Sequence, residues 1–351
     1  MPTSLVTGAS GFIGPRLVAR LQRAGRDVVC LVRKTSNTDR LKPLGVRFVT
    51  GDVTDPASLP PALGCVQGGV DEVYHLAGRL HGSTLGEFLD VNERGAHNLA
   101  EACAAQPRPP VLVVASSLAA AGPSPADTPH TEAGADAPIS KYGKSKLASE
   151  RAARRFAGRV PTTIVRPPVV FGPGDKDGFL VFQGIKRTRL HPVPNRSGLP
   201  VSLIYADDLC EAFYLAAERG ERLPASDSTG GDSTSDDTTG DKATGLYYAT
   251  DPQPTTWAEA GRMAARGMGC RVFVLKTRKW PFLIPALVGD AIGKLTGKPS
   301  IFGMDKLTEA TQPGWLCSGA KAQQQLGFAP AAPLEERYAQ TAAWYRDAGW
   351  L

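Results

Sequence analysis

The sequence lacks the features that mark membrane-spanning, exported or nucleic-acid-binding proteins. No apolar run is long enough to cross a bilayer, and the first residues do not place a basic patch before an apolar stretch. The basic residues are dispersed and have no pattern of stacking aromatics beside them, which gives no support to nucleic-acid binding. We therefore expect a cytoplasmic protein with no integral membrane span, which acts on a small-molecule substrate.

Cysteine is scarce and scattered, at Cys30, Cys65, Cys103, Cys210, Cys270 and Cys317. No two of these residues form a CxxC pair, and no Cys/His cluster has the spacing of a zinc site, so we expect no metal. Buried free thiols in a reducing compartment are expected instead. HExxH, GxSxG and P-loop motifs are also absent, so the sequence carries no signature of a zinc protease, an α/β-hydrolase or a P-loop NTPase.

What the chain does contain is a regular alternation of short apolar strands and helical stretches. Hydrophobic residues make up 42% of the 351 residues, and the formal net charge of +6 suits an anionic cofactor or substrate. The expected strands are Ser4–Thr7, Val28–Val32, Val46–Val49, Glu72–Leu76, Val111–Ala115 and Thr162–Val165. The alternation predicts an α/β fold with a doubly wound parallel sheet, and the nearly continuous apolar runs predict strands buried on both faces.

Two later segments depart from this pattern. Residues 224–245 are rich in Ser, Thr, Asp and Gly and have almost no bulky apolar side chain, which predicts a disordered surface insertion. The stretch from Trp280 to Ile292 is apolar and contains Pro281 and Pro285. It is too short to span a membrane, and we expect a lid over a substrate cavity or a core helix, with an interfacial anchor less favoured.

A glycine-rich loop follows the first strand. Strand Leu5–Thr7 leads into Gly8, Ala9, Ser10, Gly11, Phe12, Ile13 and Gly14, and a helix follows. Glycines at these positions permit a tight turn and a close approach to a pyrophosphate, which the N–H groups of the helix N-terminus would bind. The GxxGxxG spacing differs from the usual GxGxxG fingerprint, and glycines also serve ordinary turns. The place between first strand and first helix nevertheless favours a dinucleotide site.

The end of the second strand indicates which dinucleotide is bound. An acidic residue there would bind the ribose 2′-hydroxyl of NAD, but Val32 is followed by Arg33 and Lys34. Cations can bind a 2′-phosphate through charge-assisted hydrogen bonds, so NADP(H) is preferred and NAD(H) is the alternative. Both cations could instead be solvated at the strand end. Asp52 could accept a hydrogen bond from the adenine amino group, or could simply start a turn.

A candidate catalytic group combines Tyr142 and Lys146 with Ser116 and Ser117. Tyr142 and Lys146 are four residues apart on an expected helix and share a face, while the serines follow the fifth strand at the edge where ligands bind. Proton transfer to or from a secondary alcohol needs an acid/base near neutral pH. A neighbouring ammonium would lower the tyrosine pKa from about 10. Lys146 could also bind the nicotinamide ribose, and a serine hydroxyl could hold the substrate oxygen.

These stretches resemble the extended short-chain dehydrogenase/reductase family, which includes epimerases, dehydratases, dihydroflavonol reductases and 3β-hydroxysteroid dehydrogenases. The matching segments, in family order, are Thr7–Gly14, Gly51–Val53, His75–Gly78, Val91–Asn92, Ser116–Ser117, Tyr142–Lys146, Arg166–Asp175, Tyr205–Leu209, Tyr247–Asp251 and Leu326–Pro330. The resemblance implies that Tyr142 is the acid/base, Lys146 its partner, Ser117 the substrate contact, and Asn92 a support for the site. It implies further cofactor contacts at Val53, Leu76, Ala77, Gly78, Ser116 and Pro167.

The resemblance also implies a Rossmann-like organisation of the chain. Residues 1–168 would bind the dinucleotide, with 203–222 and 246–250 returning to that domain. Residues 169–202 and 251–351 would form a smaller, mostly C-terminal substrate-binding region. A homodimer through helices near 90–105 and 142–157 is likewise implied.

One departure from the family pattern bears on the substrate. Nucleotide-sugar enzymes of this family usually carry Val-Tyr-Gly shortly after the serine, whereas small apolar residues follow Ser117 here, Leu118 to Ala121. This favours an oxidoreductase acting on an apolar alcohol or ketone, steroid- or dihydroflavonol-like. A nucleotide-sugar epimerase or dehydratase is the alternative, and a dinucleotide-sensing scaffold is the non-enzymatic one. His75 is interpreted as a satisfied strand-end residue, and Arg79 with His81 as cavity lining or a solvated loop.

Overall fold

The computed structural model describes residues 1–225, 243–296 and 303–351. The disordered insertion expected over 224–245 therefore lies almost entirely outside the described residues. At the centre of the described chain is a seven-stranded parallel sheet with the order β11-β6-β5-β4-β1-β2-β3. Its strands are β1 (Thr3–Thr7), β2 (Asp27–Val32), β3 (Arg47–Thr50), β4 (Glu72–His75), β5 (Val111–Ala115), β6 (Thr162–Arg166) and β11 (Leu246–Tyr248). The predicted doubly wound α/β fold is confirmed.

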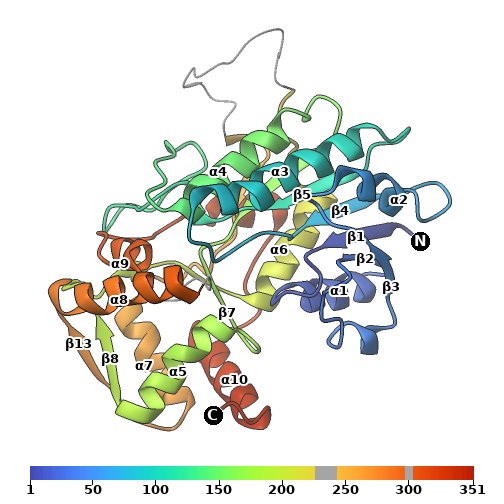
Figure 1. Cartoon of the computed structure of the whole chain (residues 1–351). Coiled ribbons are helices and arrows are strands. Elements are labelled where there is room, and N and C mark those ends of the chain that lie inside the picture. The colour runs from blue at the N-terminus through green and yellow to red at the C-terminus, as the bar shows by residue number, and fades with distance from the viewer. Residues whose placement is uncertain (226–242, 297–302) are drawn as a thin grey trace.

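Two layers of helices cover the sheet (Figure 1). One face packs against α1 (Gly14–Arg23) and α6 (Ala206–Arg219), and the other against α2 (Leu59–Leu63), α3 (Leu85–Ala104) and α4 (Lys141–Arg154). The interior strands are buried on both faces, as their apolar runs predict. The two edge strands differ, because β11 is buried throughout whereas β3 is largely exposed, with Phe48 38% exposed.

The rest of the chain forms a smaller region around a separate hydrophobic cluster. Its helices are α5 (Lys176–Thr188), α7 (Trp257–Gly267), α8 (Trp280–Thr296), α9 (Met304–Ala310) and α10 (Leu334–Asp347). Its strands pair as β7 (Val169–Phe171) with β10 (Leu203–Tyr205), β8 (Leu190–Val193) with β13 (Phe273–Lys276), and β9 (Pro200–Val201) with β12 (Thr255–Thr256).

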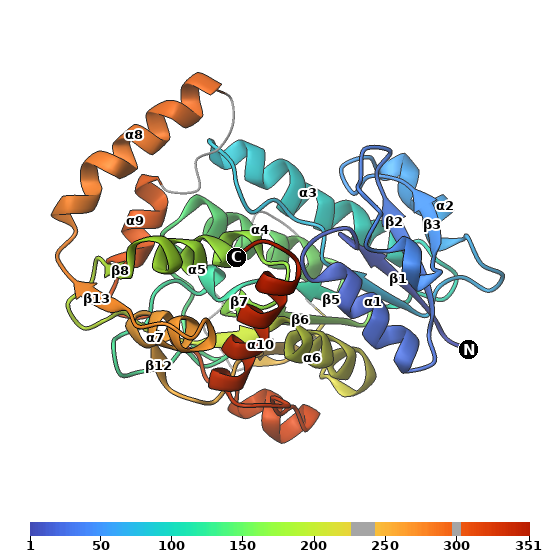
Figure 2. The ribbon, with the colours of Figure 1, turned by 90° about the horizontal axis from the view of Figure 1, so that it is seen from below.

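The apolar stretch from Trp280 to Ile292 is not a core helix. It forms most of α8, which lies at the rim of the molecule in Figure 2, and Trp280 and Ile284 are 65% and 73% exposed. No helix among the described residues is both long and apolar enough to cross a membrane. All six cysteines are free thiols, but Cys65 and Cys270 are only partly buried, contrary to expectation.

Candidate active site

A cleft of about 1080 Å³ opens at the carboxyl ends of the central strands. It lies beside β1 and β4, where the strand order reverses, which is the ligand-binding position in doubly wound sheets. Most residues predicted from the sequence line it: Gly8, Ser10, Gly11, Phe12, Ile13, Gly14, Arg33, Asp52, Val53, Leu76, Ala77, Gly78, Ser116, Ser117, Tyr142, Lys146 and Pro167. Lys34 and Asn92 do not line it.

The glycine loop forms one wall of the cleft and has no room for side chains. Gly8 has a φ of +68°, and a Cβ there would lie 2.6 Å from the backbone N of Ala77. A Cβ on Gly14 would lie 2.1 Å from the carbonyl oxygen of Ala9. Helix α1 starts at Gly14, and no side chain of the described residues caps its N-terminus. This bare backbone cradle fits a dinucleotide pyrophosphate.

Beyond the loop, the structure separates the two cations that follow β2. Arg33 lines the cleft together with Ser36, whose Oγ accepts a hydrogen bond from the Arg33 backbone N at 3.0 Å. Lys34 is exposed and does not line the cleft. Asp52 lines the cleft and also starts a turn, because its Oδ1 accepts hydrogen bonds from both the backbone N and the Oγ1 of Thr54 at 2.9 Å. Asp52 therefore starts a turn at the edge of the cleft, and its hydrogen bond to the adenine amino group stays a prediction.

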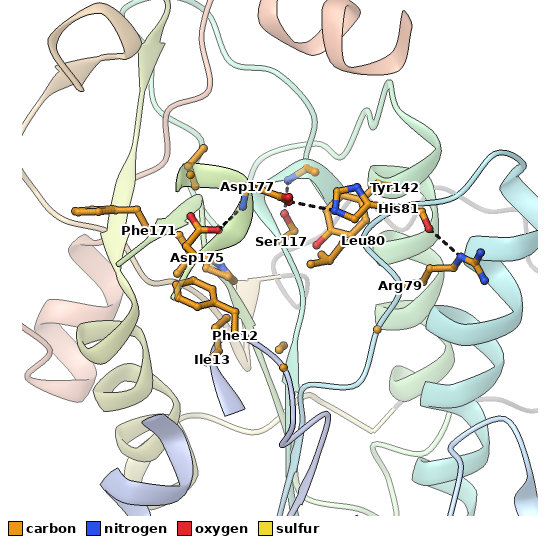
Figure 3. Close-up of a pocket in the computed structure, with 18 of the residues that line it drawn as sticks. Phe12, Ile13, Arg79, Leu80, His81, Ser117, Tyr142, Phe171, Asp175 and Asp177 are labelled. Atoms are coloured by element: carbon orange, nitrogen blue, oxygen red, sulfur yellow. Dashed lines mark hydrogen bonds and ion pairs between the residues drawn. The ribbon is translucent and has the colours of Figure 1, made fainter. Parts of the chain in front are cut away.

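The Tyr142 side chain meets the loop after β5 because of local packing at the start of α4. Ser140 caps this helix by accepting a hydrogen bond from the backbone N of Gly143 at 3.1 Å. A Cβ on Gly143 would lie 2.3 Å from the carbonyl oxygen of Ala119, so only glycine lets α4 approach so closely. This approach places the Tyr142 side chain beside Ser117, close enough for Ser117 to lower the pKa of Tyr142 (both residues are labelled in Figure 3).

The surroundings of Tyr142 favour its neutral form. Burial raises its pKa to about 12, against the lowering effect of Ser117, and the charge of Glu309 raises it further. The expectation that Lys146 lowers this pKa is therefore not met in the structure. A neutral phenol is the form that can donate a proton.

Lys146 occupies a buried position one helical turn from Tyr142. Its Nζ donates a hydrogen bond to the carbonyl oxygen of Ala115 at 2.5 Å, at the end of β5. Burial lowers the pKa of Lys146 to about 8, and the charge of Glu150 opposes that shift. The ammonium thus lies at the cleft, where a Cβ on Gly78 would be 3.9 Å from Lys146 Nζ.

A buried polar network lies beneath this pair. Arg166 donates two hydrogen bonds to Glu150, at 2.7 and 2.6 Å, and one to Asp136 at 2.8 Å. Glu150 also accepts a hydrogen bond from the hydroxyl of Ser116. Ser116 is thereby committed to the network, which leaves Ser117 as the serine whose hydroxyl reaches Tyr142.

Asn92 lies behind the cleft and acts on its neighbours. Its side-chain oxygen accepts a hydrogen bond from the backbone N of Arg79 at 2.7 Å, and its Nδ2 donates to Ser145 Oγ at 2.8 Å. It therefore ties the loop after β4 to α4, next to Lys146. This placement suits a positioning residue and not one that touches the reacting atoms.

The far end of the cleft is mainly apolar. Its lining there includes Leu80, Val169, Leu180, Val181, Leu199, Val201, Trp257, Phe282 and Trp315. Arg79 and His81 also line the cleft. Arg79 donates to the carbonyl of His81 at 2.9 Å, and His81 Nε2 lies 3.1 Å from Asp177 Oδ2 (Figure 3).

Sequence reasoning missed several lining residues, including Ser36, Thr54, Asp175 and Glu309. Ser36 and Thr54 follow motif residues closely, so the motif spacing could have indicated them. Glu309 lies in a short helix far along the chain, and no sequence pattern marks it as a neighbour of Tyr142.

Comparisons with known proteins agree with this geometry. The family model described as the NAD dependent epimerase/dehydratase family matches residues 4–228. The chain is 31% identical to a ceramide reductase of Caulobacter vibrioides over 348 residues, which cover 99% of this chain and 95% of the relative. It is 35% identical to a dTDP-6-deoxy-L-talose 4-dehydrogenase (NAD(P)(+)) of Kitasatospora kifunensis, over 48% of this chain and 52% of that protein. Among solved structures, the Thermus thermophilus UDP-glucose 4-epimerase complex with NAD matches with a TM-score of 0.73 at 21% identity, covering 99% of both chains.

Proposed function

The chain belongs to the NAD-dependent epimerase/dehydratase family of extended short-chain dehydrogenases/reductases, and from that premise we propose that it is an NADP(H)-dependent reductase of apolar ketones. The observation that carries the proposal is the place of the Tyr142–Ser117 pair. The pair lines one cleft together with the glycine loop and a mainly apolar set of side chains. When bound, the nicotinamide supplies or accepts the hydride.

In this proposal the chain's own residues handle the proton and the alignment. Ser117 holds the substrate oxygen beside the Tyr142 hydroxyl, and Tyr142, neutral because burial raises its pKa, donates the proton that completes the alcohol. Lys146 positions the ribose end of the cofactor from its place against Ala115. Arg33 binds the 2′-phosphate. In the reverse direction the same tyrosine would accept the proton, for which its pKa would have to fall.

The substrate class follows from the wall of the chamber. Aliphatic and aromatic side chains make up most of it, and small apolar residues follow Ser117, although Arg79, His81, Asp177, Lys306 and Glu309 also line the cleft. A sugar would therefore contact mainly apolar surface there. A steroid-, dihydroflavonol- or ceramide-like ketone satisfies these surfaces better. The similarity to a ceramide reductase over nearly the whole chain supports a lipid-like substrate.

A second candidate is a nucleotide-sugar epimerase or dehydratase with tightly held NAD. Similarity to a nucleotide-sugar dehydrogenase over about half the chain, together with the fold shared with a UDP-glucose epimerase, favours it. The apolar chamber weighs against it.

The homodimer through α3 and α4 also remains part of the proposal, and light scattering of the purified protein would test it.

The deciding experiment offers NADPH or NADH with two panels of ketones. One panel holds steroid, flavonoid and long-chain lipid ketones, including the ketone of a ceramide, and the other holds 4-keto nucleotide sugars. We expect consumption of NADPH with the apolar panel and formation of the secondary alcohol by mass spectrometry. Bound cofactor that undergoes no net oxidation while a nucleotide sugar is converted would overturn the proposal in favour of the second candidate.

A further inference from the structure

The outer side of α8 is an apolar surface that nothing in the described chain covers. Trp280, Ile284, Leu287 and Val288 follow the i, i+4, i+7, i+8 spacing of one helical face, and they are 65%, 73%, 57% and 51% exposed. In an ordinary surface helix such a stripe faces the core. Here these side chains are exposed, and α8 itself lies at the rim of the molecule (Figures 1 and 2).

A band of positive charge adjoins this apolar face. Arg271, Lys276, Arg278 and Lys279 are all exposed, and residues 271–289 contain no Asp or Glu. The nearest acidic residue along the chain, Asp290, accepts a hydrogen bond from the backbone N of Met304 at 3.2 Å. Phe273 and Leu275 of β13 lie between these cations in the sequence, and their apolar side chains are 65% and 44% exposed.

We propose that α8 docks the protein on an anionic lipid surface. An exposed apolar helical face with a tryptophan at its start and cations beside it is the composition of an interfacial helix. The cations complement acidic headgroups, and each cation near such a surface strengthens binding about fivefold. A second copy of the chain is a poorer occupant, because a two-fold contact through this face would bring Arg278 and Lys279 of both copies together.

The inner side of the same helix reaches the cleft. Phe282 lines the cleft, as do Lys306, Glu309 and Ala310 of the adjoining α9. A lipid surface held against the outer side of α8 would therefore lie next to one wall of the apolar chamber. The docking itself does not depend on the proposed reductase activity.

Vesicle flotation of the full chain tests the inference without any turnover. We expect the protein to float with vesicles that contain phosphatidylglycerol, to bind pure phosphatidylcholine weakly, and to be released by salt. Ile284→Ser with Leu287→Ser should abolish flotation, and Arg278→Gln with Lys279→Gln should weaken binding about 25-fold. Matched controls are Phe48→Ser on β3 and Arg151→Gln with Arg155→Gln at the C-terminal end of α4, which should float like the wild type.

Three outcomes would overturn the inference. The wild type could fail to bind anionic vesicles even at low salt, or the Ile284/Leu287 variant could bind as well as the wild type. The same variant could instead change the molecular mass in solution, which would assign the face to a second copy. Thermal melting of each variant would verify that it is folded. Because the substituted side chains are exposed, the melting temperature should stay close to that of the wild type.

Discussion

Arg166 and Glu150 form a bidentate ion pair in which each side chain is only 1% exposed. The pair joins β6 to α4, the helix that carries Tyr142 and Lys146. Asp136 and the hydroxyl of Tyr248 occupy the remaining side of the guanidinium, at 2.8 and 3.1 Å. Helix α4 is therefore held by a hydrogen-bonded network, and the pKa of Arg166 is raised because Glu150 faces it and outweighs the lowering effect of burial.

Substituting one partner of this ion pair should destabilise the protein more than replacing both partners with apolar residues. Glu150→Gln leaves a buried guanidinium without its main counter-charge, and we expect the free energy of unfolding to fall by about 3–5 kcal/mol. The double variant Glu150→Met with Arg166→Met should be closer to the wild type. Urea unfolding measures both. A loss below about 1 kcal/mol for Glu150→Gln would mean that solvent or another group compensates.

Loss of the Tyr142 hydroxyl should remove turnover and little else. We expect Tyr142→Phe to lower kcat by about 10²–10⁴-fold, because the proton donor is gone while the ring still packs against Phe88. Cofactor binding and melting temperature should change little. Tyr74→Phe, which loses a buried hydroxyl outside the cleft, is the matched control. Near-normal turnover of Tyr142→Phe would remove the acid/base role.

Cofactor preference should depend on Arg33 and not on Lys34. A charge-assisted hydrogen bond contributes about 1.5–3 kcal/mol, so Arg33→Ala should weaken NADPH binding by roughly ten- to a hundredfold and leave NADH binding nearly unchanged. Lys34→Ala is the control, because Lys34 does not line the cleft. Calorimetric titration of both cofactors gives the ratio. Equal binding of NADPH and NADH by the wild type would refute the NADP(H) assignment.

Stability should fall in acid in a way that depends on His75. Burial, helped by the charge of Lys146, lowers the pKa of this histidine from 6.5 to about 3. The neutral ring forms a hydrogen bond between its Nδ1 and Thr7 Oγ1 at 2.9 Å. Its Nε2 is buried and has no hydrogen-bond partner among the described residues, so only one of the two ring nitrogens is satisfied, where the sequence predicted a fully satisfied ring. The unfolded chain takes up this proton first. The stabilisation is therefore complete above pH 6.5 and is lost as the pH falls toward 3.

The comparison of His75→Asn with the wild type isolates this effect. The variant should be less stable at pH 7.5, and the difference should narrow below pH 6.5 by up to about 1.4 kcal/mol per pH unit. Thr7→Val, which keeps the histidine, should retain the pH dependence of the wild type. If the difference in stability between the variant and the wild type stays constant between pH 7.5 and 5, the ring is solvated and takes up a proton as readily in the folded protein as in the unfolded chain.

Local sequence patterns determined the sheet, the glycine loop and the residues of the candidate active site. Apolar runs, turn glycines and the four-residue spacing of Tyr142 and Lys146 express rules that act over a few residues, and these rules hold wherever the chain folds as α/β. The same rules could not separate Arg33 from Lys34, since both follow the strand and only the path of the next loop decides which one enters the cleft.

Burial and contacts between distant segments decided the rest. The raised pKa of Tyr142 depends on the closure of the site around it and on Glu309, which lies 167 positions along the chain. The outward apolar face of α8 also could not be read from its composition, because an apolar helix packs inward by default and only the assembled fold shows that no neighbour covers it. Desolvation and packing partners are properties of the whole fold, so residue identity and spacing alone do not contain them.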